Sequence, residues 1–423
     1  MFHVLDMRNS FDSMSITSSL TRKPQGNIVV IGAGICGSTT AAVLAQAGWQ
    51  VTLFDGQASH KGHLAAALTP VISSDDNARS RLSRLGATLA ARYWQDLQRE
   101  RGIEFGSPCG ALQLQRPEGA KRLQDLQAQA RAFNQPEWAR WVGRDEASKL
   151  AGMQLPRGGI WYPGGWLVEV PKLVQVLQQT PGVKRVDAIV ERIERARGKP
   201  TAWNVIGAQG EIVCQSNAVI LANAFDVPQL LKRSGLQAEL NACKRLPALH
   251  RLAGEITLLP ANDLGGGPKC IVGGDGYVLP AVDGWCVSGG TYERGVEAAR
   301  CTDGGRQANV DRARELLGLD LCAGKTIRHQ PVVPVAREGI DASDSLPGWA
   351  GWRAVLPGRL PAIGSVPQAS GIWVFTAGAS RGLTWSVLGA MLIRDGLVAR
   401  PEQVEPDDAL RGLDPEMRAA IEP

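Results

Sequence analysis

The sequence predicts an α/β fold, α+β overall, in which a Rossmann-like dinucleotide-binding domain is built from discontinuous segments and joined to a second domain with an antiparallel sheet. Three observations predict it. A strand, glycine turn, helix and strand occupy residues 27–55, a similar strand, glycine turn and helix occupy 372–397, and short alternating strands lie between them from Pro247 onward. At 423 residues the chain also exceeds the roughly 100–200 residues of one domain.

The first element predicts a dinucleotide site. An apolar run from Ile28 to Ile31 meets Gly32, Gly34 and Gly37 at G-x-G-x-x-G spacing, and a second apolar strand ends at Asp55. The first glycine allows a sharp turn, the second lets a pyrophosphate approach the backbone, and the third lets the helix lie close to the strand. A carboxylate at position 55 can accept hydrogen bonds from ribose hydroxyls. With every part in register, a dinucleotide site is favoured over a chance glycine turn.

Composition limits the other possibilities. The net charge of +5 is mildly basic, but residues 79–144 hold twelve Lys or Arg against six acids, which a solvated helix face or a phosphate-binding surface would explain. Eight cysteines show no C-x-x-C pair, so no metal site or disulfide framework is indicated. Residues 1–26 lack the pattern of a signal peptide and no window is long and apolar enough to span a membrane, so we expect a disordered leader and a cytoplasmic protein without a membrane partner.

The middle of the chain alternates helices and strands. Asp75 and Asp76 supply capping chemistry for a long helix over 77–101 that Gly102 ends. The pattern then predicts helices over 118–133, 144–150 and 171–179, and strands over 110–115, 183–193, 201–206, 211–215 and 218–222. The last of these strands ends at Asn223 and Ala224, where the carboxyl end of a sheet faces a cofactor.

The second half predicts the antiparallel sheet. Strands are expected over 253–259, 270–273, 276–280, 285–289 and 349–357, with a helix over 309–317. The expected division is a leader at 1–26, nucleotide-binding segments at 27–101, 158–226 and 358–423, and substrate-domain segments at 102–157 and 227–357.

The absence of a second dinucleotide motif in strand–turn–helix context favours a tightly held FAD that the substrate itself reduces. Arg353 and Arg381 would suit a substrate carboxylate, because a guanidinium binds carboxylates through paired charge-assisted bonds. Tyr277 and Tyr292 are candidates to line the same pocket, although core packing explains them equally well. His60 and His63 lie in a polar loop of the kind that covers a cofactor, where surface histidines are common.

Seven stretches resemble the D-amino-acid-oxidase-like flavoproteins, and within them the oxidoreductase half of the bacterial bifunctional tRNA 5-methylaminomethyl-2-thiouridine biosynthesis proteins. They are VVIGAGICGSTTAAVLAQAGWQVTLFD, ALTPVISSDDNARSRL, GIWYPGGWLVEVPKL, AVILANA, DGYVLPAVDGWCVSGGTYERG, WRAVLPGRLPAIG and FTAGASRGLTW, in the family's order from Asn27 to Leu397. The covering loop departs from the family's pattern, with His60-Lys61-Gly62-His63 where small residues, Ser, Gly and Asn are usual.

The resemblance implies a D-amino-acid-oxidase-like fold, FAD as cofactor, and oxidative removal of the carboxymethyl group from carboxymethylaminomethyl-2-thiouridine at the tRNA wobble position, releasing glyoxylate. The catalytic candidates are Arg353, Arg381, Tyr277 and Tyr292. The expected cofactor-binding residues are Gly32, Ala33, Gly34, Ile35, Cys36, Gly37, Asp55, Gly62, His63, Leu64, Asn223, Ala224, Gly378, Ser380, Arg381, Gly382, Leu383 and Thr384.

Three functions stay open from the residues. The first is the tRNA-modifying oxidoreductase, with a separate methyltransferase as a further partner, because the bifunctional proteins carry a methyltransferase domain ahead of this one. The second is an oxidase of a small carboxylated amine, of glycine or sarcosine type. The third is a flavin-binding assembly protein without turnover, which the altered covering loop suggests.

Overall fold

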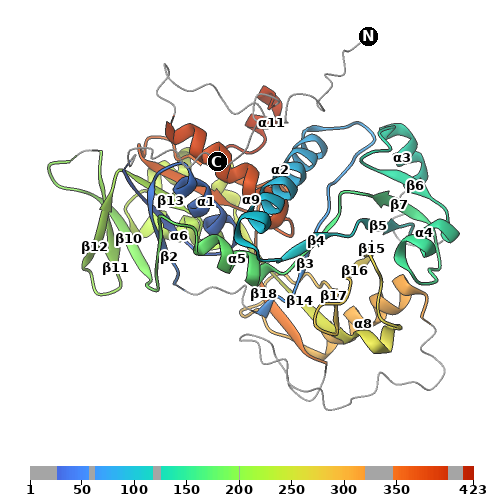
Figure 1. Ribbon diagram of the computed structural model, residues 1–423. Coiled ribbons are helices and arrows are strands. Elements are labelled where there is room, and N and C mark those ends of the chain that lie inside the picture. The colour runs from blue at the N-terminus through green and yellow to red at the C-terminus, as the bar shows by residue number, and fades with distance from the viewer. Residues whose placement is uncertain (1–25, 57–61, 118–124, 200, 320–345, 399–412) are drawn as a thin grey trace, which may run out of the picture.

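The computed structural model describes residues 26–56, 62–117, 125–199, 201–319, 346–398 and 413–423. Figure 1 shows two sheet-based parts, one holding β2 and β13 and the other holding β14–β17, with the long helix α2 between them. The expected leader up to residue 25, the loop positions His60 and Lys61, and residues 118–124, where the helix expected over 118–133 begins, lie outside the described residues.

A six-stranded sheet carries the first element. Its order is β19 (Ala362–Ser365), β20 (Ile372–Thr376), β13 (Ala218–Leu221), β1 (Asn27–Ile31), β2 (Gln50–Phe54) and β9 (Val183–Val186). All neighbours pair in parallel except β19, which is antiparallel to β20. Because side chains alternate along a strand, Ile28 and Val30 enter the core on one face, whereas Val29 and Ile31 enter the core on the other. Both faces are therefore covered, as is usual for a parallel sheet.

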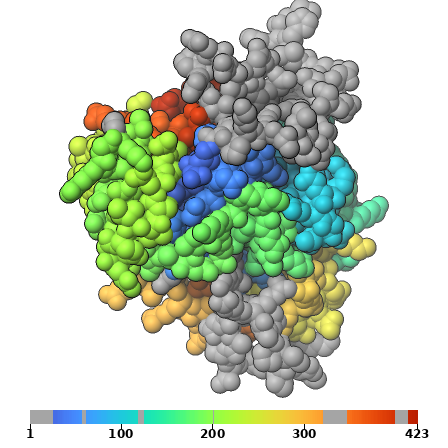
Figure 2. Space-filling model, turned by 60° about the vertical axis from the view of Figure 1, so that its left-hand side comes forward, coloured from blue at the N-terminus to red at the C-terminus, as the bar shows by residue number. Residues whose placement is uncertain are grey.

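Different layers cover the two faces. One face packs against α1 (Ile35–Gln46), α2 (Ala78–Arg101), α5 (Val170–Gln178) and α9 (Gly382–Val398). The other packs against a three-stranded sheet and two short helices, which are β10 (Val190–Arg195), β11 (Trp203–Gly207), β12 (Ile212–Ser216), α6 (Val227–Arg233) and α7 (Gln237–Ala242). Figure 2 shows the N-terminal segment in blue bordered by α2 in cyan and by green segments that include α5, so stretches distant in sequence form one surface.

An eight-stranded mixed sheet forms the second part. Its order is β18 (Gly348–Val355), β14 (His250–Pro260), β17 (Trp285–Gly289), β16 (Gly276–Val278), β15 (Ile271–Gly274), β5 (Ala111–Leu114), β7 (Gly159–Tyr162) and β6 (Arg140–Val142). One face packs against α4 (Arg144–Ala151) and α8 (Asp303–Leu317), and the other packs against α3 (Leu126–Phe133) and the chain around Leu64. A short three-stranded sheet has the order β3 (Ala66–Leu68), β8 (Trp166–Val168) and β4 (Gly106–Pro108).

Several element boundaries differ from the sequence-based expectation. The strand expected over 183–193 is two strands, β9 and β10, in different sheets. The expected return to the nucleotide-binding part at residue 158 is wrong, because β7 pairs with β5 in the eight-stranded sheet. Helices α6 and α7 pack into the core of the six-stranded sheet, so the domain boundary expected between residues 226 and 227 also moves. These shifts follow from long-range pairing, which local patterns do not encode.

Two helix starts also differ. The cap of α2 is Asn77, whose side chain accepts from the Ser80 N–H at 3.1 Å, and not Asp75 or Asp76. Helix α8 starts at Asp303, six residues before the expected start, because Thr302 caps it by accepting from Gly305 at 3.0 Å. The strand β19 and the C-terminal helix α11 (Pro415–Ala419) are additional elements. Within the described residues, no helix has both the length and the apolar character needed to cross a bilayer.

Candidate active site

The glycine turn between β1 and α1 has the packing its spacing predicts. Gly32 has φ of +106°, and a Cβ there would lie 2.5 Å from the Ala222 carbonyl oxygen. A Cβ on Gly37 would overlap the Gly32 carbonyl oxygen, so the third glycine lets α1 approach the turn. A Cβ on Gly34 would meet nothing within 4 Å. The second glycine therefore faces open space, whereas the first and third are needed for packing.

Helix α1 begins without a capping side chain at Gly34, and its first turn contains no acidic residue. Its free N–H groups and positive end suit an anion such as a pyrophosphate. Burial raises the pKa of the Cys36 thiol to about 12, so this side chain adds no negative charge. The carbonyl oxygen of Ala33 accepts from Ser38 Oγ at 2.9 Å and from Gln178 Nε2 at 3.2 Å, so this oxygen is used in holding the fold together.

Two polar groups lie at the carboxyl ends of the neighbouring strands. The side chain of Asp55 is 6% exposed and accepts from Arg185 of β9 at 2.9 Å through Oδ2. Just after β13, the Oδ1 atom of Asn223 is buried without a hydrogen-bond partner among the residues that the structure describes. A buried acceptor without a donor costs about 1–3 kcal/mol, so this atom fits a bound ligand that can donate. The next residue, Ala224, has φ of +55° and accepts from Thr376 Oγ1 at 2.7 Å.

The start of α9 meets the start of α1. A Cβ on Gly382 would lie 3.1 Å from the Ile35 side chain, and one on Gly378 would lie 3.8 Å from the Cys36 sulfur. The turn closes through a 2.8 Å bond from the Arg381 N–H to the Gly378 carbonyl. The two glycine-containing turns, about 350 residues apart in the chain, therefore lie side by side.

The other expected cofactor residues are less uniform. Gly62 is buried, and Leu64 lies in the core against the eight-stranded sheet. The ring of His63 packs edge-on against Trp349 with 4.7 Å between centroids. Ser380 is exposed, whereas Leu383 and Thr384 are buried in the helix packing. The open space at Gly34, the uncapped helix start and the unpartnered Asn223 oxygen together fit a dinucleotide such as FAD.

Arg353 comes from β18 and crosses β14. Its Nη1 donates to the Thr291 carbonyl at 3.1 Å, and its guanidinium lies 4.6 Å from the ring centre of Tyr292. The space for it comes from glycines, because a Cβ on Gly254 would overlap Nη1 and one on Gly290 would lie 3.2 Å from Nη2. No ion pair holds this guanidinium within the part of the chain that the structure describes.

The hydroxyl of Tyr277 stays protonated near neutral pH. Burial raises the pKa of Tyr277 to about 12, with Arg353 opposing the rise and Tyr292 adding to it. A Cβ on Gly289 would lie 2.7 Å from the Tyr277 hydroxyl, so the glycine makes room for this group. Tyr292 is 54% exposed although Arg353 covers its ring. Tyr277 is therefore a half-buried neutral group, and Tyr292 lies at the surface.

Arg381 also interacts with Tyr292. Its Nη1 donates to the Thr69 carbonyl at 2.7 Å. Burial lowers its pKa, and the charges of Arg79 and Arg359 lower it further, whereas Tyr162 and Tyr292 raise it. Because both Arg353 and Arg381 interact with Tyr292, the four predicted catalytic side chains gather in one region.

Three further residues of this region were missed as site residues. Tyr162, whose pKa burial raises to about 12, ends β7 in the YPGGW stretch. Arg359 follows β18 in the stretch that carries Arg353, and Arg79 lies in the first turn of α2. The resembling stretches contain all three, but only the fold brings them to Arg381.

The basic surplus of residues 79–144 does not form one open face. Arg84, which is 11% exposed, pairs with Asp76 at 2.6 Å, and its guanidinium lies 4.9 Å from the Phe133 ring centre. Arg81 pairs with Asp414 at 3.2 Å and with Glu416 at 2.6 Å. Arg84 therefore belongs neither to a solvated helix face nor to a phosphate-binding surface, because its charge is paired inside the fold.

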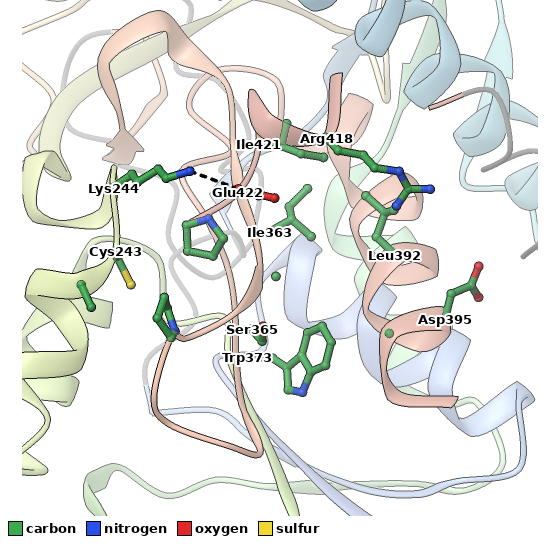
Figure 3. A pocket seen from close by; sticks show the side chains of 15 residues that line it. Cys243, Lys244, Ile363, Ser365, Trp373, Leu392, Asp395, Arg418, Ile421 and Glu422 are labelled. Carbon is green, nitrogen blue, oxygen red and sulfur yellow. Dashed lines mark ion pairs between the residues drawn. The ribbon is translucent and has the colours of Figure 1, made fainter. Parts of the chain in front are cut away.

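A pocket of about 560 Å³ lies away from this region. Its lining comes from β19, the last turns of α9 and the C-terminal residues, with a 3.7 Å pair between Lys244 and Glu422 at one side (Figure 3). Leu392 follows Arg381 along α9 by eleven residues, which is roughly 16 Å of helix. This pocket is therefore separate from the residues that fit the cofactor.

Comparison with known proteins gives a family match. The family model described as FAD dependent oxidoreductase matches residues 27–395. The tRNA 5-methylaminomethyl-2-thiouridine biosynthesis bifunctional protein MnmC of Cupriavidus necator is 31% identical over 90% of this chain and 58% of its own length. The protein of the same name from Ralstonia nicotianae is 30% identical over 93% of the chain and 60% of its own length. The chain thus spans less than two thirds of these relatives.

Solved structures share the fold. A glycine oxidase from Geobacillus kaustophilus matches with a TM-score of 0.69 and 18% identity over 92% of this chain and 98% of that one. An L-proline dehydrogenase from P. horikoshii matches with a TM-score of 0.68 and 15% identity over 95% and 100% of the two chains. At these identities the likeness supports the predicted fold class and no particular substrate.

Proposed function

This chain belongs to the family of FAD-dependent oxidoreductases, and we propose that it oxidises a carboxylated secondary amine, the carboxymethylaminomethyl group of 2-thiouridine at the tRNA wobble position. The observation that carries the proposal is that two guanidiniums, Arg353 and Arg381, both interact with Tyr292 and have no acidic partner among the described residues. Both residues are half-buried, and a partly desolvated charge without a counter-ion favours a ligand of opposite charge; a guanidinium suits a carboxylate.

The family's cofactor has a place in the site. The first turn of α1, Asn223 and the turn at Gly378 would hold FAD, and Asp55 keeps Oδ1 for a ribose hydroxyl while Oδ2 binds Arg185. Bound FAD supplies a two-electron acceptor for a C–H bond next to nitrogen. The chain's own contribution is to position the amine and to exclude competing charges near it.

Arg353 and Arg381, which together form the proposed carboxylate clamp, would set the orientation of the substrate. Arg353 Nη1 donates to the Thr291 carbonyl, and Arg381 Nη1 donates to the Thr69 carbonyl. These bonds hold both side chains in place before a ligand binds. Their remaining N–H groups would bind the two carboxylate oxygens. The neutral hydroxyl of Tyr277 can donate to or accept from the substrate without adding charge.

The products follow from the chemistry of such an amine. Loss of a hydride (two electrons and one proton) from the CH₂ carbon would leave an iminium ion. Addition of water to that carbon and cleavage of its C–N bond would then release glyoxylate and the protonated aminomethyl nucleoside. The reacting amine must be unprotonated, because its lone pair supports loss of hydride from the neighbouring carbon. The cationic guanidiniums lower the pKa of a nearby ammonium and so favour that form.

The tRNA part of the proposal is supported by relatives whose names state a tRNA biosynthesis role and which match nine tenths of the chain. A separate methyltransferase as partner remains a prediction. The test is to mix the purified flavoprotein anaerobically with glycine, with sarcosine and with tRNA bearing the carboxymethylaminomethyl group, and to follow loss of flavin absorbance. Reduction by the tRNA supports the proposal. Reduction by the small amines alone would replace it with an amine oxidase, and no reduction by any of them would indicate a flavin-binding protein without turnover.

A mutation tests the clamp. Arg353→Ala should raise KM for the carboxylated substrate by roughly tenfold or more, as for loss of a charge-assisted bond, with FAD still bound. Arg251→Ala is the matched control, because Arg251 lies next to Arg353's cross-strand partner on β14 but points to the opposite face and stacks on Trp352 at 4.5 Å. Equal kinetics for the two variants would exclude the clamp.

A further inference from the structure

A second group of positive charges lies beside the proposed clamp, where α2 and α9 begin. It consists of Arg79 in the first turn of α2, Arg359 at the end of the short turn η5 (Pro357–Arg359), and Arg381 just before α9. Burial lowers the pKa of both Arg79 and Arg381. The charge of Arg359 lowers the pKa of Arg79 further, and the charges of Arg79 and Arg359 lower that of Arg381 further. The three guanidiniums are therefore close enough to repel one another.

Printed contacts hold the two helix starts together. Arg381 donates to the Thr69 carbonyl at 2.7 Å, and two residues later Val71 exchanges bonds with α2, donating to Ser83 Oγ at 2.9 Å and accepting from Ser80 Oγ at 3.2 Å. One turn further along, a Cβ on Gly86 would overlap the Thr384 carbonyl oxygen of α9. The close approach that brings Arg79 to Arg381 is thus built into the packing of the helices.

The charges of this group are not balanced by the described chain. The next arginines of α2 have acidic partners, Arg81 in Asp414 and Arg84 in Asp76, whereas Arg79, Arg359 and Arg381 form no ion pair among the described residues. Within the described part of the chain, the Nε atom of Arg79 is buried without a hydrogen-bond partner. Arg79 also stands at the positive end of α2, where a cation is disfavoured. Three like charges held in this way fit a bound anion.

We infer that Arg79, Arg359 and Arg381 form a second anion subsite that takes a phosphate group of the substrate, next to the subsite for its carboxylate. Arg381 borders both, because it also interacts with Tyr292. Arginine suits phosphate as well as carboxylate, through paired N–H donors and a charge that does not titrate near neutral pH. A small amine such as glycine has one carboxylate and would leave this subsite empty, whereas a nucleotide within RNA brings a phosphate. The inference rests on the proposed function and names the part of the substrate that this chain recognises.

The test uses the holoprotein and two probes. Inorganic phosphate is titrated by calorimetry into the wild type and into Arg359→Gln, Arg79→Gln and Arg99→Gln. Arg359 is exposed, so its substitution leaves the core intact, and Arg99, whose side chain is 77% exposed on the same helix as Arg79, is the matched control. KM is then compared for an RNA stem-loop carrying the modified uridine and for the free nucleoside. We expect phosphate to bind roughly tenfold more weakly to the Arg359 and Arg79 variants than to the wild type and the control.

The same variants should raise KM for the stem-loop more than KM for the free nucleoside. Phosphate affinity that is equal in all four proteins would overturn the subsite, even if the stem-loop is oxidised normally and the proposed function stands. If phosphate binding is lost in the variants but the wild type does not oxidise the stem-loop, the proposed function fails and the subsite stands. If KM rises equally for stem-loop and nucleoside, the arginines belong to the carboxylate clamp and the second subsite is wrong.

Discussion

The space beside Gly34 gives the sharpest test of where the cofactor binds. Gly34 has φ of −70° and ψ of −174°, which alanine can adopt, and a Cβ there would meet nothing within 4 Å. Gly34→Ala should therefore cost the apoprotein at most about 1 kcal/mol, the difference between glycine and alanine at a helix cap. If the pyrophosphate lies against this backbone, the added methyl group overpacks the complex by about 1–3 kcal/mol, or roughly 5- to 140-fold in Kd.

The comparison variant is Gly32→Ala. At φ of +106°, with the Ala222 carbonyl oxygen 2.5 Å from the new Cβ, it should destabilise the apoprotein itself by roughly 2–6 kcal/mol. Thermal unfolding of apoprotein followed by circular dichroism, and quenching of FAD fluorescence on titration, measure the two effects separately. Normal FAD affinity in Gly34→Ala, at wild-type apoprotein stability, would refute the placement of the pyrophosphate at this turn.

Three further predictions concern the scaffold around the site. Arg84→Ala should lower the free energy of unfolding by about 1–3 kcal/mol, because it leaves the partly buried carboxylate of Asp76 without its 2.6 Å partner, and a loss below about 0.5 kcal/mol in urea unfolding would contradict this. Gly86→Ala should lower the free energy of unfolding by about 1–3 kcal/mol, because the new methyl group would disturb the contact of α2 with α9. Gly304→Ala, at a helix position with open space, should change it by less than about 1 kcal/mol. Equal melting temperatures of the two variants would count against the close approach. Burial raises the pKa of Glu255 above 4.5, so the folded state favours the protonated acid and loses stability as the pH rises through the ionisation of this group. The stability of Glu255→Gln relative to the wild type should therefore grow above pH 4.5. A difference that does not change with pH would exclude the effect.

The elements nearest the cofactor were predictable because their chemistry is local. The strand at 28–31, the helix after it and the strand at 51–54 appear as β1, α1 and β2, and the C-terminal strand, turn and helix appear as β20 and α9. Apolar β-branched runs, glycines at fixed spacing and a helix of small residues specify these elements within about 30 residues of chain. The resemblance to a flavoprotein family rested on the same stretches and agrees with the family match.

Pairing between distant segments was not predictable in this way. Residues 183–193 were expected as one strand, but the first strand ends at Val186, the second begins at Val190, and the two join different sheets. The segment 159–162 has the pattern of a strand in either large sheet, and only its pairing with β5 decides between them. A local pattern states that a strand is half-buried or buried, but not which neighbour provides its hydrogen bonds.

The charges show the same division most clearly. Composition gives an arginine-rich stretch but not the use of each arginine, and Arg84 is committed to Asp76 while Arg79, five residues earlier, has no acidic partner among the described residues. The sequence by itself determined the dinucleotide turn, its cofactor class and the family, because those depend on residues close together in the chain. Only the tertiary structure brought Arg79, Arg359 and Arg381 to one place, since a distance-dependent electrostatic interaction depends on how the helices pack and not on separation along the chain.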